Sequence, residues 1–304
     1  MVALTFSNEW YQNQYKINLK RMKKYFLFSM VLLLGTVAFG QTNRFVYVAT
    51  MKPNSAKPDD IKKELAYLDT DGKQSLFIAE KVIKRDSLMS EFRKGNQRPD
   101  FSKMQDLRST INYMIRKNLV NGDVTFENRI GRDNYAYTEN NLFTWKIEPE
   151  TMKIDKYTAQ KATTDFGGRK WTAWFTSEIP VSDGPYKFGG LPGLILKIED
   201  DKGDYKFEMA ESKKIQTIAS VNQFGQTIKV KRKDYDKVAK RFQDDPESFI
   251  MSGRGGGGGM APAPPASTQR TRVSVTGMPS GNFRERMLQE IKENNNPIEI
   301  STIK

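Results

Sequence analysis

From Val124 to Ile215 the sequence is a succession of short strand-like segments separated by turn-forming residues, and this pattern constrains the fold most strongly. The segments include "VTFENRI", "RKWTAWFTS" and "LILKIED", and the separators are "GRDN", "EPET", "GG" and "DDKG". Short runs bounded by such turns favour consecutive antiparallel strands over alternating strands and helices. The sequence therefore predicts an α+β protein that is mostly β. We expect a strongly curved, half-barrel-like antiparallel sheet of about eight to ten strands.

Two glycine-containing turns predict hairpins within this pattern. Asp71-Gly72 lies between two apolar runs, and glycine supplies the positive φ that a tight hairpin needs. The run "FGGR" at residues 166–169 is a second hairpin signal. In the strand that follows it, Trp171 and Trp174 fall on opposite faces, because side chains alternate along a strand. We therefore expect aromatic side chains on both faces of the sheet.

Apolar residues take helical spacings in residues 86–119 and again in residues 233–250. The sequence predicts one or two helices in the first region and a helix followed by a turn in the second. We expect these helices to pack on the sheet, because their apolar faces need a partner. The last segment, residues 278–304, predicts a short amphipathic helix followed by a strand-like tail.

The first 40 residues have the features of a mis-assigned start followed by a secretory signal peptide. Met22 precedes two lysines, residues 26–37 are apolar, and small residues follow up to Gly40. We interpret Met22 as the true start and Gly40 as the last residue removed. The apolar run is shorter than the roughly 20 residues of a membrane span. The sequence therefore predicts export through the Sec pathway to the periplasm, where the mature protein is soluble or loosely membrane-associated.

The mature chain divides into a β-rich domain at residues 41–251 and a C-terminal part of the same domain at residues 278–304. Between them, residues 252–277 are rich in Gly, then in Pro, then basic, and show no periodicity. Such a composition predicts a flexible insertion, because it buries too little apolar surface to offset ordering entropy. The glycines are not a phosphate-binding loop, since no Gly-Lys-Ser/Thr sequence ends them.

The chain contains no cysteine and no histidine, and its net charge is +13. The commonest metal ligands and the commonest pairs of base and nucleophile are therefore missing, and we expect no cofactor and no metal site. Removal of residues 1–40 deletes five Lys or Arg residues and one Glu, which leaves a net charge of about +9. The remaining charges are interspersed with acids rather than arranged in a stripe, so we expect no nucleic-acid partner.

The stretch "KFGGLPGLILKIED" at residues 187–200 packs three glycines and a proline into seven residues. The residues from Leu191 to Leu194 suit a type II turn, in which Pro192 fixes one φ and Gly193 supplies the positive φ. Gly189 and Gly190 allow the preceding backbone to bend or to pack closely. This structural reading is complete without a ligand.

The same stretch resembles the GLPGLI family of exported bacterial proteins. The strand "WTAWF", the loop "IPVSDGP" and the turn "GGLPGLI" occur in the order that the family uses, and "NNNPIEI" follows near the end. The resemblance covers about residues 42–301 of the chain. It implies secretion across the inner membrane of a Gram-negative envelope, and it implies no established biochemical activity.

The functional interpretation places a shaped loop, residues 178–193, at the mouth of a cavity, because long ordered loops are disproportionately functional. This loop carries Glu178, Asp183, Tyr186 and Lys187 beside Trp174, which we expect on an exposed face. These five residues are the candidate ligand-binding residues.

Two functions remain open. The first is non-catalytic binding of an apolar or envelope-derived ligand, or of a partner protein, in the concavity of the sheet. The alternative is a hydrolase of envelope polymers that uses Glu178 and Asp183 as acid and base. The missing His and Cys weaken this alternative, and we assign no catalytic residue. Surface or backbone-capping acids are the competing explanation for both carboxylates.

Overall fold

The computed structural model describes residues 42–95, 104–131, 133–221, 227–246, 249 and 282–300. All described residues belong to one compact unit, Thr42–Lys304. The expected signal peptide and the expected insertion at residues 252–277 lie outside the described residues.

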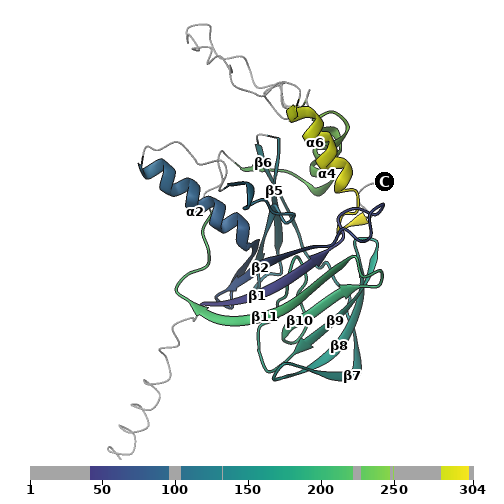
Figure 1. Ribbon diagram of the computed structural model, residues 1–304. Coiled ribbons are helices and arrows are strands. Elements are labelled where there is room, and N and C mark those ends of the chain that lie inside the picture. The colour runs from purple at the N-terminus through teal and green to yellow at the C-terminus, as the bar shows by residue number, and fades with distance from the viewer. Residues whose placement is uncertain are drawn as a thin grey trace, which may run out of the picture. The chain divides into compact units, whose positions relative to one another are not determined.

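Twelve strands form one sheet in the order β12-β6-β5-β4-β3-β2-β1-β11-β10-β9-β8-β7 (Figure 1). Neighbouring strands are antiparallel, except that β12 pairs with β6 in parallel. The mostly-β fold is thereby confirmed, with more strands than the eight to ten expected. The end strands β12 and β7 are not neighbours, so the sheet is open. The bounds are β1 Thr42–Met51, β2 Lys62–Thr70, β3 Gln74–Ala79, β4 Tyr113–Asn118, β5 Val124–Ile130, β6 Asp133–Glu139, β7 Lys146–Ile154, β8 Tyr157–Phe166, β9 Arg169–Thr176, β10 Leu194–Asp200, β11 Tyr205–Ile215 and β12 Thr227–Lys229.

Both predicted hairpins are present. Gly72 has a φ of 84° between β2 and β3, whose pairing continues to Thr70 and Ser75. Gly167 and Gly168 have φ values of 63° and 80° between β8 and β9. Two successive positive φ values are what a tight hairpin turn with the twist of the flanking strands requires. The β8–β9 turn meets this requirement, whereas the β2–β3 turn has a single positive φ, at Gly72.

The pairing register assigns alternate residues to two faces of the sheet. We call one face the inner face, because it carries the large buried side chains of the core. The opposite one is the outer face. Inner-face residues on different strands of the sheet include Tyr47, Phe77, Phe126, Tyr137, Trp171 and Phe207.

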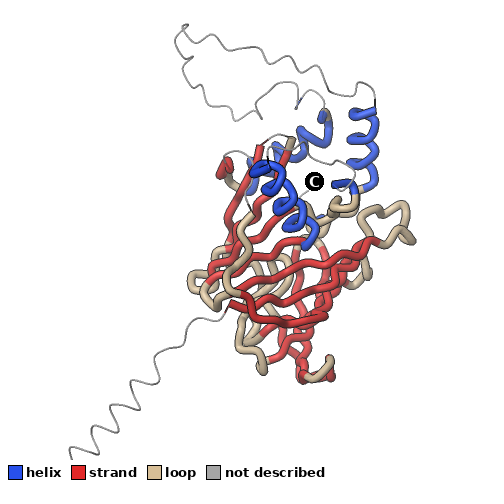
Figure 2. The backbone as a smooth tube through the Cα atoms, turned by 60° about the vertical axis from the view of Figure 1, so that its left-hand side comes forward, coloured by secondary structure: helices blue, strands red, loops and turns tan. Residues whose placement is uncertain are grey.

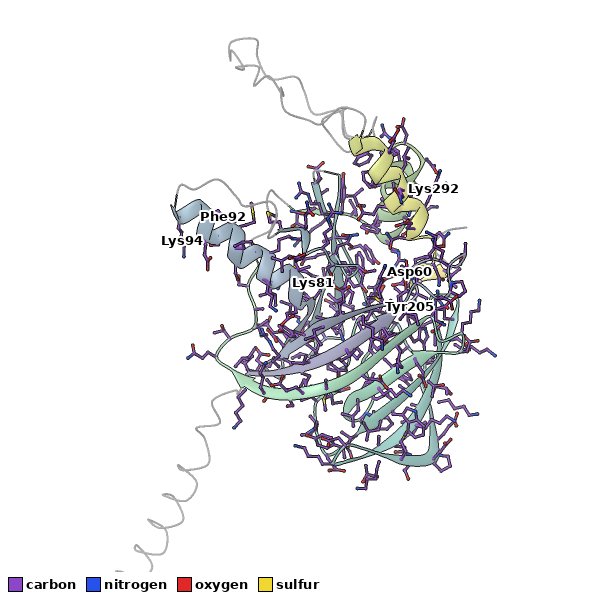
Figure 3. All side chains as sticks on the ribbon, in the orientation of Figure 1. Asp60, Lys81, Phe92, Lys94, Tyr205 and Lys292 are labelled. Carbon is purple, nitrogen blue, oxygen red and sulfur yellow. The ribbon has the colours of Figure 1, made fainter. Side chains whose placement is uncertain are left out.

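Figures 1 and 2 both show the helices toward one end of the sheet. Helix α2 (Glu80–Gly95) follows β3 directly and lies at the outer face, where Glu80 accepts a hydrogen bond from the Tyr67 hydroxyl. Its far end, marked by Phe92 and Lys94 in Figure 3, projects beyond the strands. Helix α4 (Arg232–Asp244) lies at the inner face, where Tyr235 packs on Phe126. The prediction of a helix in residues 233–250 is confirmed.

The expected helical region at residues 86–119 is wrong in its second half. Helix α2 begins earlier, at Glu80, and Met114 and Ile115 lie in strand β4. Ile115 pairs with Phe77 on the inner face, whereas Met114 pairs with Ile78 on the outer face, and both are buried. A strand that is covered on both faces has apolar residues at consecutive positions and no alternation of polar and apolar residues. The apolar residues of β4 therefore fitted a helical spacing as well.

Helix α6 (Asn282–Glu293) confirms the predicted C-terminal helix, but the strand-like tail is wrong. Residues 294–300, which we call the C-terminal strap, pair with no strand of the sheet. Their backbone donors go to loops instead: the Asn296 amide to the Pro53 carbonyl at 2.9 Å, and the Ile300 amide to the Gly167 carbonyl at 2.6 Å. Within the described ranges, no helix is long and apolar enough to cross a membrane.

Candidate functional site

The segment between β9 and β10, residues 177–193, lies on the inner face of the sheet, and we call it the motif loop. The ring of Phe188 lies 4.6 Å from that of Trp171, and the ring of Tyr186 lies 5.5 Å from that of Tyr113. Tyr186 and Phe188 are almost completely buried. The side chains of the motif loop therefore fill the part of the concavity in which a ligand was expected.

A buried lysine anchors the motif loop from the sheet. Lys117 on β4 places its Nζ 2.6 Å from Asp183 Oδ1, and it donates hydrogen bonds to the carbonyls of Gly184 and Phe188 at 2.6 and 2.7 Å. Burial lowers the pKa of the Lys117 ammonium, and the Asp183 carboxylate opposes this shift. Because all three oxygens belong to one loop, the lysine determines how the loop folds back on itself.

The Pro-Gly corner has a different geometry from the expected type II turn. The Gly193 amide donates to the Leu191 carbonyl at 2.8 Å, which makes a three-residue turn around Pro192. The Leu194 amide donates instead to the Ile179 carbonyl at 3.1 Å, so the bond that closes a type II turn is not made.

The glycines of the corner allow close approach. A Cβ atom at Gly193 would lie 2.0 Å from the Thr176 carbonyl oxygen, and the φ there is 147°. Gly190 has a φ of 85°, and Gly189 forms an isolated β-bridge with Asp183. At Gly193, therefore, no other residue type fits without a backbone shift.

A second buried lysine of the motif loop is the centre of a charged cluster. Lys187 Nζ lies 2.7 Å from both Glu139 Oε2 and Glu299 Oε1, and it donates to the Tyr137 hydroxyl at 2.9 Å. Arg232 on α4 contacts Glu139 at 3.2 Å and Glu299 at 2.9 Å. The Lys187 cluster, as we call it, consists of Lys187, Arg232, Glu139, Glu299, Tyr137 and Tyr186. It joins β6, α4, the motif loop and the C-terminal strap.

The electrostatics of the Lys187 cluster favour fixed charges. Burial disfavours the ionised form of Glu299, but Lys187 and Arg232 outweigh it and lower the pKa of this carboxyl. Burial raises the pKa of the Tyr186 phenol well above its usual value, so Tyr186 is a neutral donor to Glu299. Two cations thus face two carboxylates, and each carboxylate is neutralised where it lies. This arrangement stabilises a contact between four segments.

The five predicted ligand-binding residues do not gather at one place. Trp174 points to the outer face, between Lys161 and Lys197 of the neighbouring strands, and is only 8% exposed. Glu178 is on the surface, where it accepts a hydrogen bond from the Thr158 amide at 2.8 Å.

Asp183 is enclosed with Lys117, so it does not share an environment with Glu178. Only Tyr186 and Lys187 meet, at Glu299. Trp174 was expected on an exposed face, and the structure buries it. A role for the five in ligand binding stays a prediction.

Sequence reasoning missed the partners of these residues. Lys117 takes the inward position of β4, two residues after Ile115, and this alternation was the available signal. Glu299 lies in "NNNPIEI", which carried part of the family resemblance. No local sequence pattern marked Glu139 or Arg232 as cluster residues, because their ion pairs are made with segments that are distant in the sequence.

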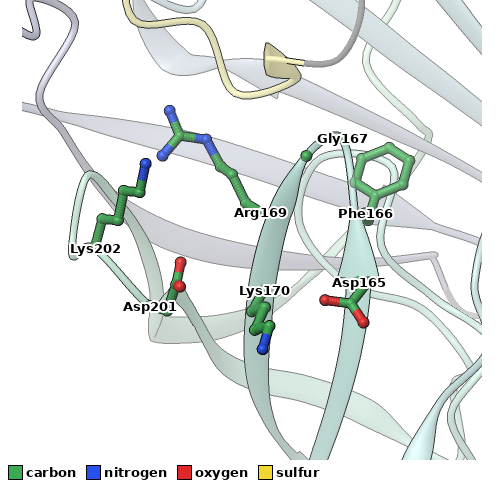
Figure 4. Close-up of a pocket in the computed structure, with 8 residues that line it drawn as sticks. Asp165, Phe166, Gly167, Arg169, Lys170, Asp201 and Lys202 are labelled. Atoms are coloured by element: carbon green, nitrogen blue, oxygen red, sulfur yellow. The ribbon is translucent and has the colours of Figure 1, made fainter.

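A pocket lies at the rim of the sheet where the β8–β9 turn meets the turn after β10 (Figure 4). We call this the rim pocket. Its volume is about 360 Å³. Lys170 and Lys202 line it together with Asp165 and Asp201, and all four are exposed. The lining residues are Asp165, Phe166, Gly167, Gly168, Arg169, Lys170, Asp201 and Lys202.

Arg169 forms the buried side of the rim pocket. Its guanidinium contacts Asp200 at 2.6 Å and Asp204 at 3.0 Å, and it donates to Asn296 of the strap at 2.6 Å. Because the guanidinium of Arg169 is paired inside the fold, the charges that a ligand could reach in the rim pocket are those of the exposed lysines and acids. Among the described residues, no group of three or more Asp or Glu side chains is arranged to hold a metal ion.

A protein-family model described as a protein of unknown function (Porph_ging) matches residues 167–197. These residues comprise the β8–β9 turn, β9, the motif loop and the start of β10. No curated protein matches the chain.

Two solved structures similar to this chain are crystal forms of a protein named PNGF-II. They are 20% and 19% identical, with TM-scores of 0.47 and 0.49. The similarity covers 65% and 67% of this chain but only 32% and 33% of the PNGF-II chains, so this chain spans about a third of their length.

Proposed function

We propose that this chain is an exported protein of the GLPGLI family that acts in the periplasm by binding rather than by catalysis. The proposal of family and export is supported by the motif at residues 189–195 and by the signal-like order of residues 22–41. The matched family of unknown function covers the same motif.

One observation carries the preference for binding: three buried carboxylates of the inner face are paired with cations, and another, Glu64, accepts hydrogen bonds from the Ser109 hydroxyl at 2.6 Å and the Ile111 amide at 2.9 Å. Asp183 pairs with Lys117, Asp200 with Arg169, and Glu299 with Lys187 and Arg232. A general acid near neutral pH needs a raised pKa, whereas the pKa of Glu299 is lowered. These pairs support a scaffold role for the inner face.

The rim pocket is the binding site that we propose, in place of the concavity. An apolar ligand in the concavity would compete with Phe188 and Tyr186, which already pack there. The rim pocket offers two lysines, two acids and the half-buried ring of Phe166 to a ligand from outside. Such a lining suits a polar, charged component of the envelope or a partner protein better than a lipid tail.

A capture experiment tests the proposed site. The mature protein, immobilised and exposed to solubilised envelope material, is expected to retain a component that mass spectrometry identifies. Lys170→Glu combined with Lys202→Glu should abolish retention, because the charges of the two exposed lysines of the pocket are reversed. The matched control, Lys73→Glu combined with Lys214→Glu, changes exposed lysines away from the pocket and should retain the component. Equal retention by both pairs would contradict the site, and turnover of an envelope polymer would contradict the non-catalytic role.

Export has its own test. Expression from Met22 should yield a periplasmic protein whose first residue, by N-terminal sequencing, is Gln41. A protein that stays in the cytoplasm with its first residues intact would contradict the export proposal.

A further inference from the structure

The C-terminal strap is held at its first end by Asn296. Its side chain accepts a hydrogen bond from Arg169 at 2.6 Å and donates one to the Lys52 carbonyl at 2.8 Å. Its backbone carbonyl accepts a hydrogen bond from the Tyr205 hydroxyl at 2.6 Å. In Figure 4 this C-terminal segment passes over Arg169 and Gly167. Both the side chain and the backbone of Asn296 are therefore hydrogen-bonded to other segments of the domain.

Glu299 holds the second end of the strap, three residues further on. Its carboxylate contacts Lys187 at 2.7 Å and Arg232 at 2.9 Å, and it accepts a hydrogen bond from Tyr186. Between the two ends, Ile298 is buried, and the Pro297 carbonyl accepts a hydrogen bond from Arg169 at 3.0 Å. The Gly167 turn fits closely here, since a Cβ atom at Gly167 would lie 3.0 Å from the Glu299 Cα atom.

The groove that receives the strap belongs entirely to the other segments of the domain. Arg169 is on β9, Lys187 is in the motif loop, and Arg232 is on α4. These cations and the hydroxyls of Tyr205 and Tyr186 recognise an asparagine, a proline, an apolar residue and a glutamate in succession. Charged, hydrogen-bonded recognition of this kind gives specificity for one short peptide sequence.

The strap follows α6, and 32 residues, 250–281, separate the start of α6 at Asn282 from Phe249, the last described residue before it. A chain of this length spans up to roughly 100 Å when extended. The same segment can therefore reach a groove on a neighbouring molecule as well as its own.

We propose that this groove is a peptide-binding groove that accepts residues 294–300 of a second copy of this chain, so that two copies exchange their straps. The second copy is the occupant because its sequence already fits every contact that the groove makes. The chain's own strap competes strongly for the groove, since a tethered segment acts at an effective concentration of about 1 mM. Exchange therefore requires high protein concentration or a weakened strap.

The test uses the full chain with Asn296→Ala and Glu299→Ala, which weakens its own strap and leaves the groove intact. A labelled peptide of residues 294–300 should bind this variant at least about tenfold more tightly than it binds the unaltered chain, measured by fluorescence anisotropy. A peptide with both anchors changed to alanine is the matched control and should not bind. If the double variant does not fold, Glu299→Gln alone serves as the weakened chain.

The occupant is tested by sedimentation of the two full chains mixed at high concentration. The unaltered strap must leave its own groove to enter that of the double variant, so mixed dimers are expected only as the protein concentration approaches the effective concentration of about 1 mM, and the double variant alone should stay monomeric. A folded variant that binds no peptide, or that binds the control peptide equally well, would overturn the groove. Peptide binding without mixed dimers would overturn the second copy as its occupant.

Discussion

The two buried lysines of the inner face differ in what surrounds them. Lys117 is enclosed, and its three partners all belong to residues 183–188 of the motif loop. Lys187 is equally buried, but its partners Glu139 and Glu299 come from distant segments, and the side chain of Glu139 is 24% exposed. The first lysine folds one loop, whereas the second fastens separate segments together.

This difference predicts two levels of stability within one domain. Breaking an enclosed ion pair leaves a buried charge without a partner, which affects the whole fold. Breaking a contact at the edge of the core releases one segment, and water can reach the charges left behind. The Lys117 site should therefore behave as part of the core, and the strap contacts should behave as a local closure.

The largest expected effect is that of Lys117→Met. It leaves Asp183 buried without a cation, and the free energy of unfolding should fall by about 3–5 kcal/mol. Urea denaturation measures the change. Lys117→Met combined with Asp183→Asn removes both charges and should recover part of the loss. A single variant that loses less than about 1 kcal/mol would place Lys117 outside the core.

Gly193→Ala is expected to be the next most harmful change. The new Cβ atom would meet the Thr176 carbonyl at 2.0 Å, so the loop or β9 must shift, at a cost of about 3 kcal/mol. Gly72→Ala is the matched control: its φ is also positive, but no atom lies within 4 Å, and about 1 kcal/mol should be lost. Equal losses in the two variants would show that close packing at Gly193 contributes nothing.

Glu299→Gln should cost less, about 2 kcal/mol, because it weakens hydrogen bonds to charged groups at the partly open edge. The pKa of Glu299 is lowered in the folded protein, so its contribution is present above its ordinary pKa of 4.5. The contribution is lost as the pH falls through the folded pKa. Thermal unfolding between pH 7 and pH 3 should show a smaller acid-induced loss in the variant. If the stability of the variant and that of the unaltered chain fall in parallel between pH 7 and pH 3, Glu299 makes no contribution to the acid-induced loss.

The smallest effect is expected for Glu178→Ala. Glu178 is exposed and makes one hydrogen bond, to the Thr158 amide, so the stability should stay within about 0.5 kcal/mol. The same variant examines the earlier hydrolase hypothesis. An activity on envelope polymers that is present in the unaltered chain and lost here would revive it.

The sequence allowed the β pattern, the two hairpins and helix α4 to be predicted, because alternation, glycine turns and helical spacing are local signals. Strand β4 was missed because Met114 and Ile115 are buried on opposite faces, which removes the alternation. Residues 178–193 were expected to form a loop at the mouth of a cavity, or a turn that only links two strands, rather than a segment packed inside the fold. The burial of the motif loop depends on Lys117, 66 residues from Asp183, and no local pattern indicates such a pair.

Native-state hydrogen exchange tests the two-level description most directly. The amides of Phe188 and Ile195, which donate to Pro185 and Asp183 carbonyls, should exchange only through global unfolding. Those of Asn296 and Ile300 in the strap should exchange through a smaller opening of lower free energy. If the amides of Phe188 and Ile195 exchange as readily as those of the strap, the claim that this Gly-Pro loop is part of the core is contradicted.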